Sequence, residues 1–253
     1  MKRLLGKALD NAISLGVVII VLFLIIPIRT ELLDFLLIIN IGLSIMILMI
    51  TMNISETLEF SIFPSLLLVT TLFRLGLNVS SPRAILSKGY AGEVIQNFGN
   101  LITGGNIVVG VVIFLIIVLV QFIVITKGAE RVAEVAARFT LDAMPGKQMA
   151  IDADLSSGLI NEQQARIRRE KVQRQADFYG AMDGATKIVK GDAVMSLIIT
   201  LINFVAGLII GMVQGGGDFA SVVQVYSIAT IGDGLVSQLP ALMISTATGM
   251  IVT

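Results

Sequence analysis

The chain has 253 residues, of which 55% are hydrophobic and only 14% charged, far from the balance of a soluble domain. It carries 18 basic and 18 acidic residues, so no net charge draws it toward nucleic acid. Cysteine and histidine are both absent, which excludes disulfides, thiol nucleophiles, imidazole catalysis and the usual zinc sites. Composition thus predicts a membrane protein without a cofactor or metal, and no catalytic constellation indicates an enzyme.

Long apolar stretches predict an all-α polytopic fold with about six transmembrane helices. A crossing needs about 20 mainly apolar residues, and five stretches satisfy this: 12 to 28, 32 to 52, 62 to 79, 103 to 126 and 193 to 213. A sixth, 222 to 252, is interrupted by Gly232-Asp233-Gly234 and by Pro240, which predicts a broken or tilted helix. Gly207 and Gly211 form a Gly-x-x-x-Gly pair, which favours close helix packing and is compatible with oligomerisation.

One charged region divides the chain into three parts. Residues 127–192 hold 11 of the 18 basic and 10 of the 18 acidic residues, between four helices in 1–126 and two more in 193–253. Lys2, Arg3 and Lys7 place the N-terminus in the cytoplasm by the positive-inside rule, and four crossings return residues 127–192 to the same side. The sequence therefore predicts a small charged cytoplasmic domain.

Two helices are expected in this domain. In the first, which would continue span four, side chains of alternating charge share one face and would form salt bridges within or between subunits: Arg131, Glu134, Arg138 and Asp142. Met144-Pro145-Gly146 should end it. The second should begin at Asn161, an N-cap with Gln164 three residues later, and run to about Tyr179. Its less polar face would either pack on a neighbour or be solvated.

Charges close to the apolar stretches allow two interpretations each. Asp192 follows Lys187 and Lys190 at the start of span five, where it could cap a helix or exchange a proton or cation at a pathway mouth. Asp233 lies inside the last span, either in an unwound ion-coordinating segment or in a solvated re-entrant turn. Arg74, near the predicted outer end of span three, is expected to reach the interface without a special role.

Three segments carry a resemblance that covers essentially the whole chain. They are Arg131-Val-Ala-Glu134-Val-Ala-Ala-Arg138-Phe-Thr-Leu-Asp142-Ala-Met-Pro-Gly-Lys147, then Asp177-Phe-Tyr-Gly-Ala-Met-Asp183-Gly-Ala-Thr-Lys187-Ile-Val-Lys-Gly-Asp192, and Ile231-Gly-Asp233-Gly-Leu-Val-Ser-Gln-Leu-Pro240. They resemble the flagellar, hypersensitive-response and invasion protein export pore family of type III secretion, closest to its flagellar branch.

The resemblance implies an export gate in the bacterial inner membrane, at the flagellar basal body. Such a gate would be a homo-oligomeric ring, thought to be a nonamer, acting with other membrane components of the export apparatus. It would couple the proton or sodium gradient to passage of unfolded flagellar proteins. The resemblance ties this coupling to the residues matching Asp192, Lys187, Asp233, Asp142, Arg131 and Arg138. Family members continue into a large cytosolic domain, so a fragment ending at Thr253 is expected.

Two rival functions follow from the residues alone. The interrupted last span and its buried charge would also suit a self-contained secondary transporter for a small solute. A structural membrane scaffold, in which the charges only cap helices and set topology, is the third possibility. The resemblance favours the export gate over both.

Overall fold

The structure is a computed structural model that describes residues 15–124, 130–214 and 218–252. Within these ranges the chain is helical and contains no strand, which confirms the predicted all-α class. A short helix spans Leu15–Ile25. The remaining elements are α2 (Thr30–Met52), the 3-10 turn η1 (Thr57–Phe60), α3 (Phe63–Lys88), α4 (Glu93–Thr103), α5 (Ile107–Val124), α6 (Glu130–Asp142), α7 (Met144–Ser156), α8 (Glu162–Gln214) and α9 (Phe219–Val252).

Five of these helices are long and apolar enough to cross a membrane: α2, α3, α5, α8 and α9. The helix Leu15–Ile25 lies within the predicted first span and is shorter, while residues 12 to 14 of that span fall outside the described part of the chain. The chain is therefore a polytopic helical membrane protein.

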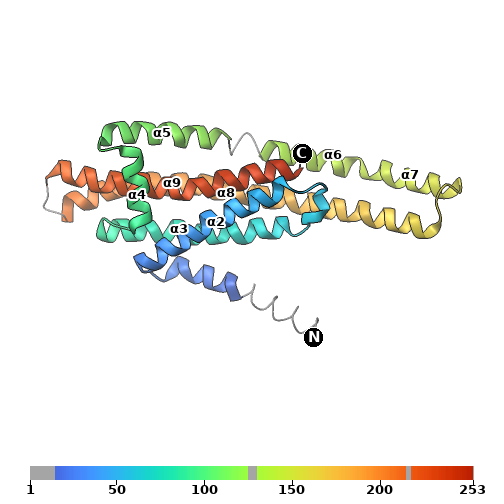
Figure 1. The fold of residues 1–253 in the computed structure, drawn as a ribbon, viewed down its shortest axis with the longest axis horizontal. Helices are drawn as coiled ribbons and strands as arrows, with labels where there is room; N and C mark the ends of the chain where they lie inside the picture. The colour runs from blue at the N-terminus through green and yellow to red at the C-terminus, as the bar shows by residue number, and fades with distance from the viewer. Residues whose placement is uncertain (1–14, 125–129, 215–217, 253) are drawn as a thin grey trace.

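The long helices form one elongated bundle (Figure 1). α2, α3, α8 and α9 lie together, α5 lies along one side, and the short α4 crosses the others steeply. In the most apolar window of α9, 67% of the residues are buried, against 17% in α5. α9 is thus the central helix, whereas α5 presents its apolar surface outward, as a helix in contact with lipid does.

A helical arm extends beyond the bundle (Figure 1) and consists of α7 and residues 162–177 of α8. Its small core contains Ile151, Ile160, Ala165 and Val172. The second predicted helix therefore packs on a neighbour and is not merely solvated. Lys171 Nζ lies 2.9 Å from Glu56 Oε2, which ties the arm to the segment before η1.

The predicted start of α8 is confirmed, but its predicted end near Tyr179 is wrong. Asn161 and Gln164 form the reciprocal capping box, with N–O distances of 2.8 and 3.0 Å. The helix then continues for 53 residues, about 80 Å at 1.5 Å per residue. It can continue because no proline interrupts it and because isolated glycines such as Gly180 and Gly184 weaken a helix without ending it. The predicted boundary between residues 192 and 193 thus lies inside one helix.

The break at Met144-Pro145-Gly146 occurs as predicted, since α6 ends at Asp142. Proline in the first turn then starts α7, because it needs no intrahelical N–H bond there. α7 continues to Ser156 and places Asp154 2.9 Å from Arg168 on α8. Asp152 pairs with Arg169 in the same way.

Arg83 of α3 lies next to the C-terminal end of the helix Leu15–Ile25. Its guanidinium donates hydrogen bonds to the carbonyl oxygens of Leu24 and Ile25, at 3.0 and 2.9 Å. A cation is favourable there because a helix C-terminus carries partial negative charge. This charge therefore fixes the helix Leu15–Ile25 to α3.

The prediction that the last span is broken is wrong, because α9 is continuous from Phe219 to Val252 with Pro240 inside it. Its glycines serve close packing instead. A Cβ on Gly232 would lie 1.9 Å from the carbonyl oxygen of Ile95, where α4 crosses α9. The pair Gly207 and Gly211 likewise receives the ring of Tyr226 from α9, so this motif packs a helix of the same chain.

Gly232→Ala should destabilise the protein, because the new methyl group would collide with the α4 backbone. We expect a loss of about 1–3 kcal/mol in unfolding free energy, measured as a lower melting temperature of the purified protein in detergent. Gly180→Ala on α8 is the control, since its Cβ meets open space and alanine favours helix. Equal melting temperatures for the two variants would contradict this α4–α9 crossing.

Candidate functional site

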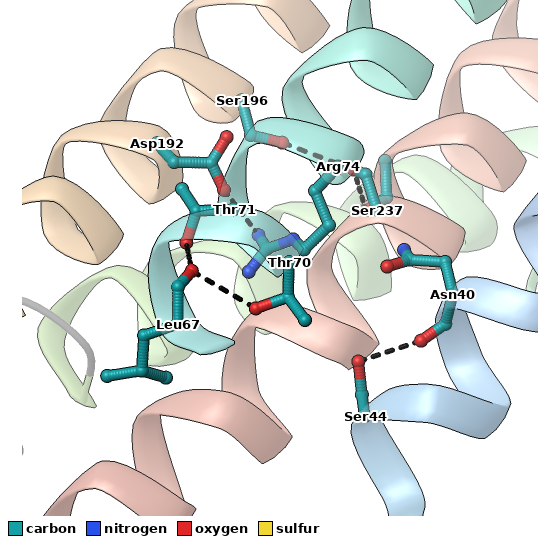
Figure 2. Close-up of polar contacts among 10 residues, drawn as sticks. Asn40, Ser44, Leu67, Thr70, Thr71, Arg74, Asp192, Ser196 and Ser237 are labelled. Carbon is teal, nitrogen blue, oxygen red and sulfur yellow. Dashed lines mark hydrogen bonds and ion pairs between the residues drawn. The ribbon is translucent and has the colours of Figure 1, made fainter. Parts of the chain in front are cut away.

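A charged pair lies inside the bundle. Arg74 Nη2 of α3 is 2.9 Å from Asp192 Oδ2 of α8, and the two side chains are only 1% and 2% exposed. Figure 2 shows the guanidinium turned toward the carboxylate, with Thr70, Thr71, Ser196 and Ser237 around the pair. Burying one charge alone would cost several kcal/mol, so each group makes the burial of the other tolerable.

The expectation that Arg74 reaches the membrane interface is wrong. The predicted span ended at residue 79, but α3 continues through Pro82 to Lys88, which places Arg74 near its middle. From there the side chain cannot reach either end of the helix, and it turns inward instead. The arginine is fully buried, at 0% exposure.

The pair is incompletely satisfied by hydrogen bonds. Thr70 and Thr71 donate their hydroxyls to backbone carbonyls of their own helix, including Leu67 at 3.1 and 2.6 Å. Arg74 and Asp192 are at ion-pair distance without the alignment of a hydrogen bond. The three nitrogens of the guanidinium therefore have no hydrogen-bond partner among the described residues. Such a pair is held mainly by charge, so neutralising one member should release the other.

Asp192 is neither a helix N-cap nor a surface carboxylate. It lies well inside the continuous α8, which excludes the capping interpretation. Lys187, expected beside it, is an exposed residue whose Nζ donates to Asp183 Oδ2 at 2.7 Å. Asp192, predicted from the sequence as a candidate for ion exchange, is thus buried, and its ion-pair partner is Arg74 of α3.

Asp233 is also buried, at 5% exposure, in the central helix α9. Asn203 Nδ2 of α8 donates to its Oδ2 at 3.4 Å, and Ser81 of α3 is its second polar neighbour. Both predicted conformations of this segment are therefore wrong, because it is neither unwound nor a solvated turn, while the ion-coupling role of Asp233 stays a prediction. Asp233 is a carboxylate enclosed by helices of the same chain.

The charges of α6 remain outside this site. Arg131 pairs with Glu134 at 3.2 Å and Arg138 with Asp142 at 3.8 Å, all with largely exposed side chains. The alternating face predicted from the sequence therefore exists, and these two pairs form within one helix. Exposed pairs of this kind contribute only about 0–1 kcal/mol each to stability.

Sequence reasoning gave Arg74 no special role and missed the polar residues around the two carboxylates. A signal was available, because Asp192, Ser196 and Thr200 recur four residues apart in an apolar helix, on one face. All three are buried. Polar residues sharing one face of a membrane helix indicate an interior facing other helices.

The fold and this site define a class of protein: a polytopic helical membrane protein that encloses an arginine–aspartate pair and a second carboxylate. The FHIPEP family profile matches residues 20–253. The chain is 60% identical over 244 residues to flagellar biosynthesis protein FlhA of Bacillus subtilis, covering 96% of this chain and 36% of that protein. The chain therefore belongs to the FHIPEP family.

Two further relatives show the breadth of the similarity. FlhA of Salmonella typhimurium is 52% identical over 255 residues, covering 98% of this chain and 37% of that protein. The low calcium response locus protein D of Yersinia pestis is 50% identical over 249 residues, covering 98% and 35%. The chain thus spans little more than a third of these relatives. No solved structure matches it.

The buried pair predicts strong energetic coupling between its two members. Arg74→Gln or Asp192→Asn alone should cost about 3–5 kcal/mol, because each leaves the other charge unpaired in the interior. The double variant should cost much less than the sum of the two, as measured by thermal unfolding of all four proteins in detergent. The exposed pair Arg166 and Glu170 gives the matched control, with single effects of about 0–1 kcal/mol. Additive losses at Arg74 and Asp192 would show that the two do not interact.

Proposed function

We propose that this chain forms the membrane part of an export gate in the flagellar type III protein export apparatus. Its membership of the FHIPEP family and its similarity to two flagellar biosynthesis proteins support this role. The proposed cargo is unfolded flagellar protein, passed across the bacterial inner membrane at the basal body. The gate would do mechanical rather than catalytic work, with no covalent chemistry of its own.

In this proposal, the Arg74–Asp192 pair couples the ion gradient to the gate. The observation that carries it is the burial of Asp192 against an arginine of a different helix. A proton on Asp192 would cancel its negative charge and leave Arg74 as an unpaired buried cation. Because that state is costly, α3 and α8 would move into a second arrangement.

Because α8 is continuous, a movement at Asp192 would be transmitted along the helix to the arm. The same helix carries Asp192 in the bundle and residues 162–177 in the arm, without a break between them. A rotation or shift at Asp192 would therefore move the arm directly. By the positive-inside rule the arm would lie in the cytoplasm, where export substrates arrive.

We also propose that copies of the chain assemble into a ring, with a nonamer as the expected size. Large apolar side chains lie exposed on α6, on the arm and in the connection between α7 and α8, outside the apolar part of the bundle, where lipid would not cover them: Phe139 (71% exposed), Met149 (67%), Leu159 (76%) and Ile167 (57%). Exposed apolar groups of this kind mark contact surfaces. The charges of α6 would then adjust contacts within or between subunits. Other membrane components of the export apparatus would adjoin the ring.

The rival transporter function is not favoured. Its main support was a broken last span, and α9 is continuous. Family membership supports protein export instead.

Asp192→Asn should reduce export of flagellar proteins at least tenfold, because the side chain can no longer gain or lose a charge opposite Arg74. The measurement is the amount of flagellar subunit in the culture medium of cells carrying the full-length protein, normalised to its level in the membrane. Glu170→Gln on the arm is the control, since Glu170 belongs to an exposed pair. Asp192→Glu, which keeps a titratable group, should retain part of the export. Full export by a stably inserted Asp192→Asn protein would end the coupling proposal.

A further inference from the structure

A groove opens on the outside of the bundle between α5 and α8, and residues of α9 form its floor. Its volume is about 280 Å³, and its lining is apolar apart from the side chains of Thr200 and Thr230. Leu115 of α5 and Leu201 of α8 line it and are 58% and 63% exposed, so the groove is open at its rim. We name this cavity the α5–α8 groove.

A smaller cavity of about 20 Å³ continues the groove toward the C-terminal end of α5. Val118 and Leu197 line both cavities, so the two adjoin. The smaller cavity is polar, because Gln121 of α5 and Gln238 of α9 line it. Among the described residues, the side-chain oxygens of both glutamines are buried without a hydrogen-bond partner. The groove therefore changes from apolar to polar toward one end.

A lysine of α8 lies just beyond this polar end. Lys190, Ala193 and Leu197 are spaced by three and four residues, so they share one face of the helix. Ala193 and Leu197 line the smaller cavity, which places Lys190 one helical turn further along the same face. Along this face a cation is followed by amides and then by an apolar groove. A phospholipid has the complementary order of phosphate, glycerol esters and acyl chain.

We propose that the α5–α8 groove binds one anionic phospholipid of the cytoplasmic leaflet. An acyl chain fills the apolar groove, the glycerol region meets Gln121 and Gln238, and the phosphate lies at Lys190. Ester carbonyls accept hydrogen bonds from the amide N–H groups, and interfacial water donates to the amide oxygens. This inference does not depend on the export function, because it concerns only what the membrane part binds.

The length of the groove suits a lipid chain and not a helix of another subunit. Its lining residues extend over eleven residues of α5, from Val111 to Phe122, and over eleven of α8, from Ala193 to Phe204. At 1.5 Å per residue, each run is about 16 Å long. One leaflet supplies about half of the 30 Å of hydrocarbon, which is about 15 Å. A second transmembrane helix would need a contact surface twice as long.

The bound lipid would support α8 beside the buried ion pair. α5 packs mainly on α9, where a Cβ on Gly234 would lie 2.5 Å from the ring of Phe114, and it makes little direct contact with α8. A lipid chain in the groove fills the space between α5 and α8. Its polar end is level with Ala193, the neighbour of Asp192. Anionic lipid would thus stabilise the position of α8 at the pair.

Photo-crosslinking locates the lipid. The full-length protein is placed in vesicles of phosphatidylethanolamine and phosphatidylglycerol, with a diazirine on the acyl chain of the phosphatidylglycerol. After illumination, mass spectrometry of the peptides should find at least tenfold more adduct per residue on the groove segments of α5 and α8 than on the exposed face of α2. Adducts spread evenly over α2, α5 and α8 would mean ordinary bilayer contact and would overturn the site.

Blocking the groove should remove these adducts. Leu197→Trp fills the space where the two cavities adjoin and should lower the groove adducts at least tenfold. Ile202→Trp is the matched control, because Ile202 is 56% exposed on α8 and does not line the groove. An unchanged adduct pattern in a stably inserted Leu197→Trp protein would contradict the proposal.

The choice of headgroup is tested without altering the apolar groove. With the same diazirine chain, phosphatidylglycerol should give about fivefold more groove adduct than phosphatidylcholine, since one lysine near the membrane surface attracts an anionic lipid to about this extent. Lys190→Gln should bring this ratio close to one, whereas Lys147→Gln, an exposed lysine on the arm, should leave it unchanged. Equal adduct from the two lipids in the unaltered protein would overturn the preference for an anionic lipid.

A photoreactive benzoylphenylalanine in place of Leu201 tests the identity of the occupant in the native membrane. Leu201 lines the groove at its open rim, so its replacement should form adducts with the mass of a phospholipid. A covalent link to a second subunit or to another membrane protein, in place of lipid adducts, would show that a protein helix fills the groove and would overturn the lipid site.

Discussion

A charge inside a membrane protein must find its compensation within the protein, because the surrounding hydrocarbon offers none. In this chain that constraint joins α3 to α8 through Arg74 and Asp192, at 2.9 Å in a fully buried setting. The pair lies beside the central helix α9, whose residues 227–238 are all buried. α4, fixed at its first turn by Asp34 of α2 and packed on the backbone of Gly232, completes the enclosure. Both charges are therefore held away from the surface of the bundle.

The same arrangement places the pair where it can act on a distant part of the molecule. α8 is a single helix from the arm to the far end of the bundle, so a change at Asp192 need not pass through a loop. In the proposed mechanism the pair has two states, paired and released, and neutralising the aspartate changes which of them is favoured. Surface pairs such as Arg138 and Asp142 lack this property, because solvent screens them in either state.

Local features of this fold were largely readable from the sequence. Apolar length located the long spans, the Asn161 and Gln164 pattern located the start of α8, and Pro145 located the break between α6 and α7. Non-local features were not. The partner of Asp192 lies on another helix. Polar residues after position 79 made the predicted span shorter than α3, so the sequence placed Arg74 near the end of a helix and not near its middle. Gly232 and Gly234 looked like helix breakers because sequence shows their freedom but not the helices that pack against them. The resemblance of the charged segments indicated the family, yet the coupling residues that it implied include Lys187 and not Arg74.

The most direct test of this account is a high-resolution structure of the full-length protein in a lipid bilayer, read at Arg74 and Asp192. The account predicts that the guanidinium contacts the carboxylate within one subunit and that both side chains are well ordered. Arg74 turned toward the membrane interface, or Asp192 paired with Lys187 in place of Arg74, would contradict it.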